Sequence, residues 1–489
     1  MSSNSSAIVI MAAGQGSRMK SNVPKVLHEI CGVPLISHII DRIAETTPTS
    51  PIAFVVEHEK QLVIDSIQKH AKFKELDISF IHQGETRGTG DAVRSAIESD
   101  WGARILSEKR PVVVLPGDLP LISNKLIQSM IEPMQRATKI RLLTCELSEP
   151  AGYGRIVRRG KKGVVIRIVE EKDATPRQKS IKEVAVSIYQ FDPAFLKAGI
   201  RNLSKNNAQN EYYLTDLIAR ATQTKNKIAV VEWTEVLDLR GVNTPWELTQ
   251  ARSIMNRRIL KSHAENGVCL ADNNSIWIDS TVKIGDRVQI CPNTIIRGSS
   301  TIGPDTQLGA GVYIKDSTIG ANCIIKPYSI IDQSIIGNSV KLGPSAHLRP
   351  ESKVGDGSKV GNFVELKKTS IGKKTSIAHL SYLGDATVGN NCNIGCGFIT
   401  CNFDGREING KRKHETIIED DCFLGSDCQV VAPILISKGA YIASGSTITK
   451  DVESDSLAIA RSKQINKLGY ASRLRRTLNM NQTTPKDNR

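Results

Sequence analysis

The chain has 489 residues, which is enough for two or more domains with buried cores. Its net charge of +15 is compatible with nucleic-acid binding, but the basic residues are spread along the chain and no aromatic-rich basic module accompanies them. No apolar run has the length of a membrane span, and Met1–Ser6 is polar rather than signal-like. We therefore expect a cytoplasmic protein that acts on small molecules, with no nucleic-acid or membrane partner.

The first half of the chain alternates short apolar runs with stretches of helical spacing. Helices are expected at Pro34–Ala44 and Thr89–Glu98. Strands are expected at Ala7–Met11, Ile52–Val56, Asp77–Ile81, Pro111–Leu115 and Ile140–Thr144. This alternation predicts an α/β domain with a Rossmann-like, mostly parallel sheet of the doubly wound type.

A glycine-containing loop, AAGQGSRM at residues 12–19, follows the first strand, and Lys25 comes soon after it. Glycines let backbone N–H groups approach phosphate oxygens, and Arg18 and Lys25 can neutralise them. The loop lacks the third glycine of dinucleotide-binding proteins and the Gly-Lys-Ser/Thr of P-loop proteins, so both classes are set aside. Asp118, at the end of another strand, is placed either to hold Mg²⁺ against phosphates or to cap the next turn.

A single helix is expected to connect the two halves of the chain. Pro245–Glu265 places Leu248, Ala251, Ile254 and Ile259 at helical spacing. We assign this segment no chemistry.

The second half repeats an aliphatic residue every six positions, a period that neither an α-helix nor an ordinary strand produces. The series begins Ile278, Ile284, Ile290, Ile296, Ile302, Leu308 and Ile314, and it returns as Ile418, Leu424, Val430, Ile436, Ile442 and Ile448. It slips by one residue at Ile319, Ile336, Ile371 and Val388. The pattern predicts a left-handed parallel β-helix with one inward side chain on each flat face of a triangular coil.

These patterns divide the chain into an α/β domain at 1–244, a linker helix at 245–266, a β-helix at 267–460 and a basic tail at 461–489. The chain becomes polar and basic after Tyr470, and Asn479–Arg489 is predicted to be disordered.

The ten cysteines include no CxxC pair. Cys323, Cys392, Cys422 and Cys428 each stand two residues before an aliphatic residue of the series, at a position for small side chains. We expect buried thiols, with metal or redox roles as the alternative.

Several longer strings are more specific than any of these patterns: AAGQGSRM, LRPESKVG, VGNFVELKK, AHLSYLGDA, NIGCG, TCNFDG and GSDCQVVAP. Together they resemble the bifunctional N-acetylglucosamine-1-phosphate uridylyltransferase / glucosamine-1-phosphate N-acetyltransferase family over essentially the whole chain. The resemblance implies acetylation of glucosamine-1-phosphate by acetyl-CoA, followed by Mg²⁺-dependent uridylyl transfer from UTP with release of pyrophosphate. It also implies a homotrimer with a shared acetyltransferase site, and a product that supplies peptidoglycan and lipopolysaccharide.

The resemblance assigns roles in the first domain residue by residue. Asp118 and Asn243 would hold Mg²⁺, Gly154 and Glu170 would contact the sugar, and Arg18 and Lys25 would be catalytic. UTP would be bound by Ala12, Ala13, Gly14, Gly16, Lys25, Gln83, Gly88 and Thr89, with Gln83 reading the uracil. Such a reaction needs positioning and charge neutralisation more than proton transfer.

In the β-helix the resemblance makes His379 the general base that deprotonates the attacking sugar amine, a role that suits an imidazole near neutral pH. Substrate contacts would come from Arg349, Glu365, Lys367, Tyr382, Asn393 and Lys413. Acetyl-CoA contacts would come from Cys396, Asn402, Phe403, Ser426, Ser444 and Arg461. The loop at Asn402–Thr416 is longer than the family pattern, which leaves Lys411 as an alternative to Lys413.

The chain departs from the family pattern mainly around the first site. Ala185-Val186-Ser187 replaces an Asn-Thr-Gly type triplet whose asparagine hydrogen-bonds the amino sugar, and further departures occur at Glu57, Asp91 and Pro116. We hypothesise that UTP binding persists while sugar recognition is weakened, altered or provided by other residues. Two other functions remain open at this point: a nucleotidyltransferase for another sugar or base, and a non-catalytic binding protein of the exchange-factor type.

Overall fold

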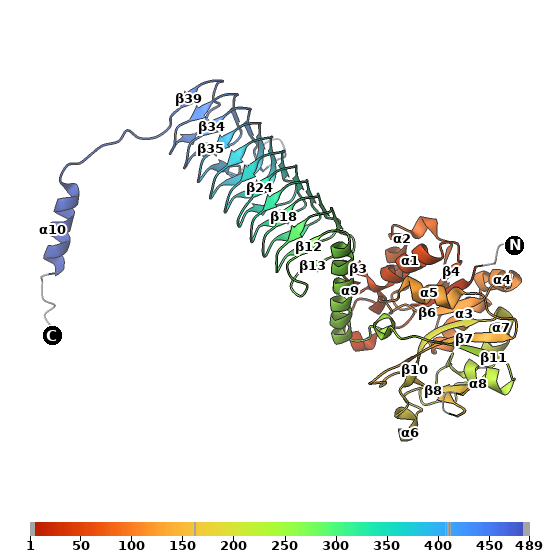
Figure 1. Ribbon diagram of the computed structural model, residues 1–489. Helices are drawn as coiled ribbons and strands as arrows, with labels where there is room; N and C mark the ends of the chain where they lie inside the picture. The colour runs from red at the N-terminus through yellow and green to blue at the C-terminus, as the bar shows by residue number, and fades with distance from the viewer. Residues whose placement is uncertain (1–4, 161–162, 406, 408–409, 411, 483–489) are drawn as a thin grey trace. The chain divides into compact units, whose positions relative to one another are not determined.

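The computed structural model describes residues 5–160, 163–405, 407, 410 and 412–482 and separates into two compact units (Figure 1). The first unit contains residues 1–283 and 295–299, and the second contains residues 284–294 and 300–489. The linker helix belongs to the first unit. The four-part division made from the sequence stays a prediction.

The first unit is built on a nine-stranded sheet whose main path runs β11-β7-β10-β6-β1-β4-β5. These strands are β1 (Ala7–Met11), β4 (Ile52–Val56), β5 (Ile78–His82), β6 (Val112–Pro116), β7 (Thr138–Glu146), β10 (Glu183–Phe191) and β11 (Lys227–Glu232). β1 pairs in parallel with both β4 and β6, as the sequence predicts. β10 runs antiparallel to β6 and β7, and it also pairs with the hairpin of β8 (Gly154–Arg158) and β9 (Val165–Val169).

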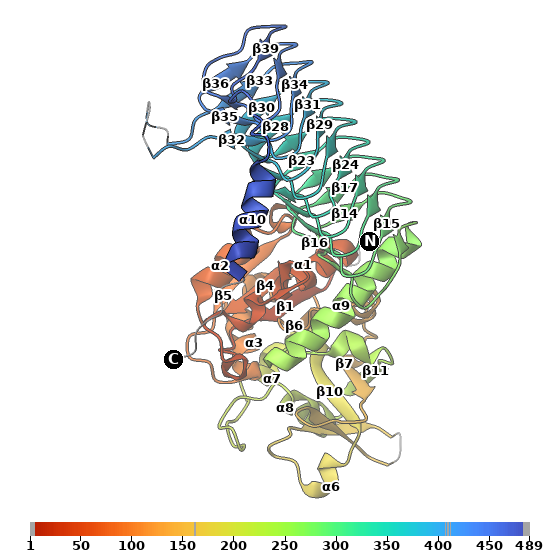
Figure 2. The ribbon, with the colours of Figure 1, turned by 90° about the vertical axis from the view of Figure 1, so that its left-hand side faces the viewer.

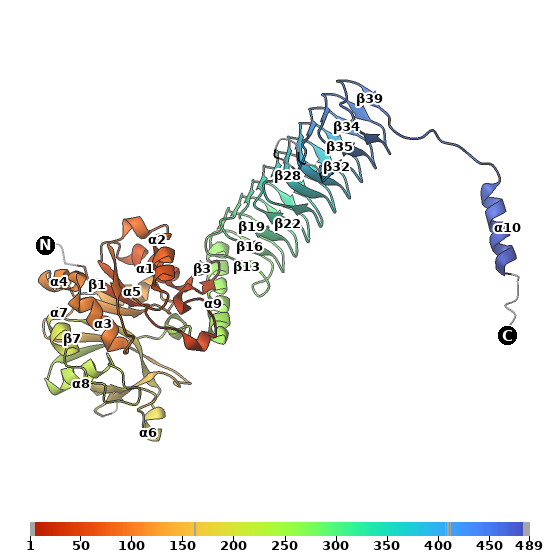
Figure 3. The same cartoon turned by 180° about the vertical axis from the view of Figure 1, so that it is seen from behind.

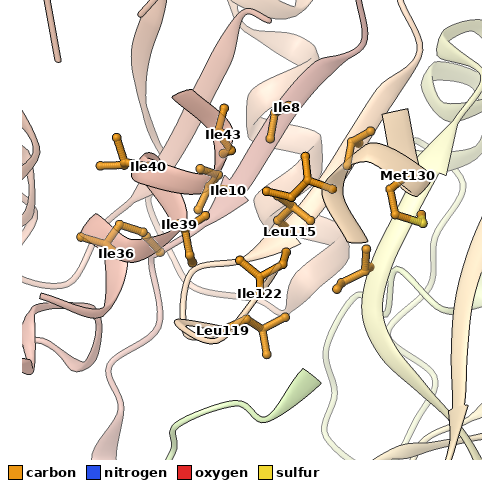
Figure 4. Packing of buried hydrophobic residues seen from close by; sticks show 14 of the residues in the cluster. Ile8, Ile10, Ile36, Ile39, Ile40, Ile43, Leu115, Leu119, Ile122 and Met130 are labelled. Atoms are coloured by element: carbon orange, nitrogen blue, oxygen red, sulfur yellow. The ribbon is translucent and has the colours of Figure 1, made fainter. Parts of the chain in front are cut away.

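Helices cover both faces of this sheet. They are α1 (Leu35–Thr46), α2 (Lys60–Gln68), α3 (Thr89–Glu98), α4 (Asp100–Ser107), α5 (Asn124–Ile131), α6 (Pro176–Lys179), α7 (Pro193–Ile200) and α8 (Asp216–Gln223). Alternate residues of β1 enter different cores: Ile8 and Ile10 pack with α1 and α5 (Figure 4), whereas Ala7 and Val9 pack with α3. Burial on both faces explains why the strand is apolar at every position.

The linker helix is α9 (Pro245–Glu265), with the bounds that the sequence predicts. Its first turn is closed by a capping box: the Thr244 hydroxyl accepts a hydrogen bond from the Glu247 N–H, and the Glu247 carboxylate accepts one from the Thr244 N–H. Pro245 at the first helical position has a φ angle suited to that turn.

The second unit is a solenoid whose short strands stack in three parallel columns (Figures 2 and 3). The first column contains β15 (Gln289–Ile290), β18 (Gln307–Leu308), β21 (Ile324–Ile325), β24 (Lys341–Leu342), β27 (Lys359–Val360), β29 (Ser376–Ile377), β31 (Asn393–Ile394), β34 (Phe423–Leu424), β37 (Tyr441–Ile442) and β39 (Leu457–Ala458). The second contains β19 (Tyr313–Lys315), β22 (Ile330–Asp332), β25 (His347–Leu348), β28 (Glu365–Ile371), β30 (Tyr382–Val388), β32 (Ile399–Cys401), β35 (Gln429–Val431) and β38 (Thr447–Ile448). The third contains β17 (Thr301–Ile302), β20 (Thr318–Ile319), β23 (Ile335–Ile336), β26 (Lys353–Val354), the second halves of β28 and β30, β33 (Thr416–Ile418) and β36 (Ile434–Ile436).

The six-residue series forms the core of this solenoid. Leu308, Ile325 and Leu342 are paired in register between neighbouring coils and are buried, and the same holds along each column. The one-residue slips fall at the corner between the second and third columns. In β28 and β30 this corner is so short that one strand continues across it. The predicted β-helix is confirmed.

The four cysteines of the series are buried free thiols, as expected. Each thiol lies near a carbonyl oxygen of a neighbouring coil, for example Cys323 Sγ at 3.1 Å from Gly337 O. Small side chains at this position leave room for the turn of the chain.

The end of the chain differs from the prediction. A helix, α10 (Tyr470–Gln482), begins where the sequence becomes basic, so the expectation of disorder is wrong for residues 479–482. Arginine and leucine, which are frequent in this helix, are good helix formers. Residues 483–489 lie outside the described part of the chain. Among the described residues, no helix combines the length and the apolar character needed to cross a bilayer.

Candidate active sites

The first unit has a cleft of about 630 Å³ at the edge where its parallel strands end. Most of the residues that the sequence selected line it: Ala12, Ala13, Gly14, Arg18, Lys25, Gln83, Gly88, Thr89, Asp118, Gly154, Glu170 and Asn243. They come from loops that are far apart in the sequence, and the parallel pairing of β1 with β6 brings several of these loops to one edge. The predicted constellation is therefore assembled in space.

Gly16 is the one residue of this unit predicted from the sequence that does not line the cleft, and its role is to let the chain pack closely. Its φ angle of 64° lies in the left-handed region, and a Cβ atom there would lie 2.7 Å from Cβ of Lys25. A glycine at this position thus lets the loop after β1 pack directly against Lys25.

Cationic and oxygen-bearing side chains meet at the centre of the cleft. The Lys25 ammonium contacts the Asp118 carboxylate and donates to Asn243 Oδ1 at 3.1 Å. Arg18 Nη2 donates to the same Asn243 oxygen at 2.9 Å. A carboxylate and an amide oxygen thus already face one cationic group, and oxygen donors of this kind fit a small divalent cation.

Gly154 and Glu170 also line this cleft. A Cβ atom on Gly154 would lie 2.8 Å from Cγ2 of Ile168, so the absence of a side chain lets the backbone of Gly154 pack directly against Ile168. Glu170 accepts a hydrogen bond from Thr215 Oγ1 at 2.9 Å. Burial raises the pKa of the Glu170 carboxyl above its ordinary value of 4.5.

The triplet at 185–187 also lines the cleft. The pairing of β10 with β7 changes register between Ala185 and Tyr189, and Ser187 has a φ angle of 58°. This left-handed conformation favours glycine, which is the residue of the family pattern at this position.

Glu247 lines the cleft too, and the sequence analysis did not select it. Its Oε2 accepts hydrogen bonds from the N–H groups of Asn243 at 2.6 Å and Thr244 at 2.9 Å, which fixes the turn that presents Asn243. The spacing Thr244-Pro-Trp-Glu247 is that of a capping box and could have identified this residue.

In the solenoid, one corner column contains His379 and most of the residues selected for acetyl-CoA. Backbone N–H groups link the successive coils: Gly397 donates to His379 O at 2.9 Å, Asp427 to Cys396 O at 2.6 Å, and Gly445 to Ser426 O at 2.9 Å. Arg461 Nη1 then donates to Ser444 O at 2.7 Å. The stacking therefore arranges these residues along one edge in the order His379, Cys396, Ser426, Ser444 and Arg461.

The His379 side chain is exposed, and its Nδ1 contacts Asn362 Oδ1 in the preceding coil. An amide oxygen can only accept, so Nδ1 bears the proton and Nε2 retains its lone pair. Asn362 was not selected from the sequence, because its contact depends on which coil lies next to His379.

The substrate residues gather on the second column beside this edge. Glu365 and Tyr382 are paired in register on β28 and β30, and Lys367 lies two residues after Glu365 on the same face. Arg349 Nη1 donates to Glu365 Oε1 at 2.9 Å. Asn393 lies on β31 in the first column, on the other side of the corner.

The long loop after β32 contains the remaining residues. Asn402 is buried and its Nδ2 donates to Asp385 Oδ2 at 2.6 Å. The Lys413 ammonium lies 4.2 Å from the centre of the Phe403 ring, a cation–π contact. Lys411, the alternative to Lys413, lies outside the described residues.

Family models match both halves of the chain. A MobA-like NTP transferase domain matches residues 8–155, and a GMPPB C-terminal domain matches residues 273–349. Bacterial transferase hexapeptide repeats match residues 333–368, and the hexapeptide repeat of succinyl-transferase matches residues 415–450.

Curated relatives match almost the entire chain. The bifunctional protein GlmU of Caldanaerobacter subterraneus is 41% identical over 463 residues, which cover 94% of this chain and 96% of the relative. The chain belongs to the GlmU family. GlmU of Halalkalibacterium halodurans is 41% identical, covering 95% and 98%, and that of Geotalea uraniireducens is 40% identical, covering 96% and 99%. Membership confirms the predicted family, the two-part fold and a bifunctional transferase of UDP-N-acetylglucosamine synthesis, which acts on nucleotide and sugar-phosphate substrates.

The raised pKa of Glu170 leads to a pH prediction. Between the ordinary pKa and the raised one, the folded state binds more protons than the unfolded state, so this group lowers stability as pH rises through that window. We expect the free energy of unfolding of the wild type, relative to Glu170→Gln, to fall as the pH rises above the ordinary pKa of 4.5. Urea unfolding at several pH values measures this difference.

Glu171→Gln is the matched control. Burial raises the pKa of Glu171, but hydrogen bonds from Arg155 and the Gly152 amide lower it, and the net shift is downward. The stability of the wild type relative to this variant should therefore rise with pH. If the stability difference from the wild type changed with pH in the same way for both variants, the raised pKa of Glu170 would be contradicted.

Proposed function

We propose that the cleft of the first unit transfers a uridylyl group from UTP to N-acetylglucosamine-1-phosphate, and that the corner column of the solenoid transfers acetyl from acetyl-CoA to glucosamine-1-phosphate. The main support for the first reaction is the meeting of Lys25, Arg18, Asp118 and Asn243 at one point. The support for the second is the exposed His379 at the head of a continuous column of coils.

In uridylyl transfer, a phosphate oxygen of the sugar phosphate attacks the α-phosphorus of UTP, and pyrophosphate leaves as the bond to the β-phosphate breaks. The loop of Gly14 and Gly16 offers backbone N–H groups to the phosphates. Arg18 and Lys25 neutralise the charge that develops on the leaving group. Asp118 and Asn243 would hold Mg²⁺, which supplies charge neutralisation and orients the triphosphate.

In acetyl transfer, Nε2 of His379 accepts a proton from the sugar amine as its nitrogen attacks the thioester carbonyl. The C–S bond then breaks, and the protonated His379 gives its proton to the leaving sulfur, so coenzyme A leaves as the thiol. Asn362 fixes the imidazole tautomer through Nδ1. Arg349 and Lys367 would bind the sugar phosphate, and the backbone near Cys396 would stabilise the oxyanion.

We also propose a homotrimer, and the exposed position of the second site supports it. Two large apolar side chains adjoin the catalytic corner, Phe363 next to Asn362 and Leu380 next to His379, and they are 58% and 62% exposed. Apolar exposure at a site is typical of a surface that another subunit covers. We also place the protein in the cytoplasm, because UTP and acetyl-CoA are intracellular metabolites; cell fractionation tests this location.

His379→Ala should lower kcat for acetyl transfer by about 10²–10⁴-fold, because a positioned general base contributes that much. Release of free thiol from acetyl-CoA measures the reaction. Uridylyl transfer by the same variant, followed as pyrophosphate, should remain unchanged and shows that the protein is folded. Acetyl transfer at the wild-type rate would contradict the role of His379.

Ala185→Asn should restore a hydrogen bond to the amino sugar, which is equivalent to about 1–3 kcal/mol in binding. We expect a lower KM for N-acetylglucosamine-1-phosphate and an unchanged KM for UTP. A normal wild-type kcat/KM for this sugar, together with no effect of the substitution, would contradict the hypothesis of weakened sugar recognition. Ala185→Val, which adds volume without a hydrogen-bonding group, is the control.

Sedimentation equilibrium of the full chain should give the mass of three subunits. The trimer completes the second site, so dilution to concentrations at which the trimer dissociates should reduce acetyl transfer while uridylyl transfer persists. A monomer mass at concentrations where acetyl transfer is complete would overturn the shared site.

A further inference from the structure

The side-chain amide of Gln83, which lines the cleft, is held by two oxygen acceptors. Its Nε2 donates to Asp91 Oδ2 at 3.3 Å and to the backbone oxygen of Gly88 at 3.4 Å. A carboxylate and a carbonyl oxygen can only accept hydrogen bonds at neutral pH. The amide nitrogen must therefore face these two groups, because the reversed orientation would place three oxygens together.

This orientation determines what Gln83 can offer to a ligand. With both donor hydrogens directed to the protein, Oε1 is the atom left to bond a base, and it is an acceptor. The N3 atom of uracil bears a hydrogen, whereas the N3 atom of cytosine bears a lone pair. A fixed acceptor therefore favours uracil, while a freely rotating amide could satisfy either base.

Asp91 is itself held in place. It lies in the first turn of α3 and is 9% exposed. Its other oxygen, Oδ1, faces Arg94 Nη1 at 3.5 Å. Arg94 in turn donates to Ile200 O at 3.2 Å and lies 4.2 Å from the centre of the Tyr212 ring. The carboxylate cannot follow a rotation of the Gln83 amide without losing this partner.

A second carboxylate fixes the backbone beside Gln83. Glu57 Oε2 accepts a hydrogen bond from the Gly84 N–H at 2.8 Å, and the Gln83 N–H donates to Val56 O at 3.2 Å. Glu57 and Asp91 are both positions where the chain departs from the family pattern. Two positions at which the chain differs from the family pattern, Glu57 and Asp91, therefore both act on Gln83.

We propose that Asp91 is a positioning residue for base selection, which holds the Gln83 amide in the orientation that accepts a hydrogen bond from uracil and rejects cytosine. The proposal rests on the proposed uridylyl transfer at this cleft. Asp91 acts through Gln83 and does not itself contact the nucleotide.

The test compares UTP with CTP for the full-length protein with N-acetylglucosamine-1-phosphate and Mg²⁺, followed as pyrophosphate. For Asp91→Ala we expect the ratio of kcat/KM for UTP over CTP to fall about tenfold, since a lost polar discrimination of this kind costs that order. The change should lie in KM for UTP, with kcat altered by less than about threefold. Asp91→Asn keeps an acceptor oxygen and should retain the wild-type ratio within about threefold.

Two further variants separate base selection from packing. Arg94→Leu removes the partner of Asp91 Oδ1 but leaves Oδ2 as an acceptor for Gln83, so it should lower the ratio by less than Asp91→Ala does. In a Gln83→Leu background, Asp91→Ala should change the ratio no further, because the residue through which it acts is absent. The proposal is overturned if Asp91→Ala lowers kcat/KM equally for UTP and CTP, or if Arg94→Leu reduces their ratio as much as Asp91→Ala does. It is also overturned if Asp91→Ala still reduces the ratio in the Gln83→Leu background.

Calorimetry measures the affinities for UTP and CTP, and their ratio reports base selection without turnover. If the wild type releases no pyrophosphate from UTP, the proposed function fails, while the binding ratio still decides the role of Asp91. If the wild type is active and its ratio is unaffected in Asp91→Ala, only the present proposal fails.

Discussion

Both sites depend on the pairing of parallel strands in register. In the first unit, parallel β1, β4 and β6 end at the same edge, so the glycine loop and Asp118 meet although about a hundred residues separate them. In the solenoid, parallel stacking places each corner directly above the next, so His379 and Arg461 belong to one continuous edge. In both sites, backbone hydrogen bonds between strands or coils place the site residues next to one another.

The solenoid tolerates a missing residue in a corner but not in a column. A shift within a column would turn the inward aliphatic residues outward, because successive side chains of a strand point to opposite faces. The corners between columns two and three absorb the slips without disturbing the stack of Leu348, Leu366 and Leu383. Chemistry can therefore vary at the corners while the core remains the same.

The features that could be predicted from the sequence are those that burial or the spacing of a motif determines. The strands and the six-residue series were found because burial imposes a period, and the site residues were found through their strings. The antiparallel direction of β10 was not predicted, because a buried strand has the same pattern in either direction. Asn362 and Asp385 were missed because each acts through a side-chain contact with another coil, His379 or Asn402, which no local pattern records.

The departures in the first cleft change hydrogen-bonding groups more than backbone shape. Ser187 keeps a left-handed conformation that would suit glycine, although a side chain makes this conformation less favourable. The register change in β10 lies between Ala185 and Tyr189, and Gly154 is the partner of Ala185 on the neighbouring strand. A cleft with Ala185 in place of an amide offers one hydrogen-bonding group fewer, so it should discriminate less between polar groups. Glu170 lines the cleft together with Ala185, whereas the carboxylates of Glu57 and Asp91 hold the backbone at Gly84 and the side chain of Gln83.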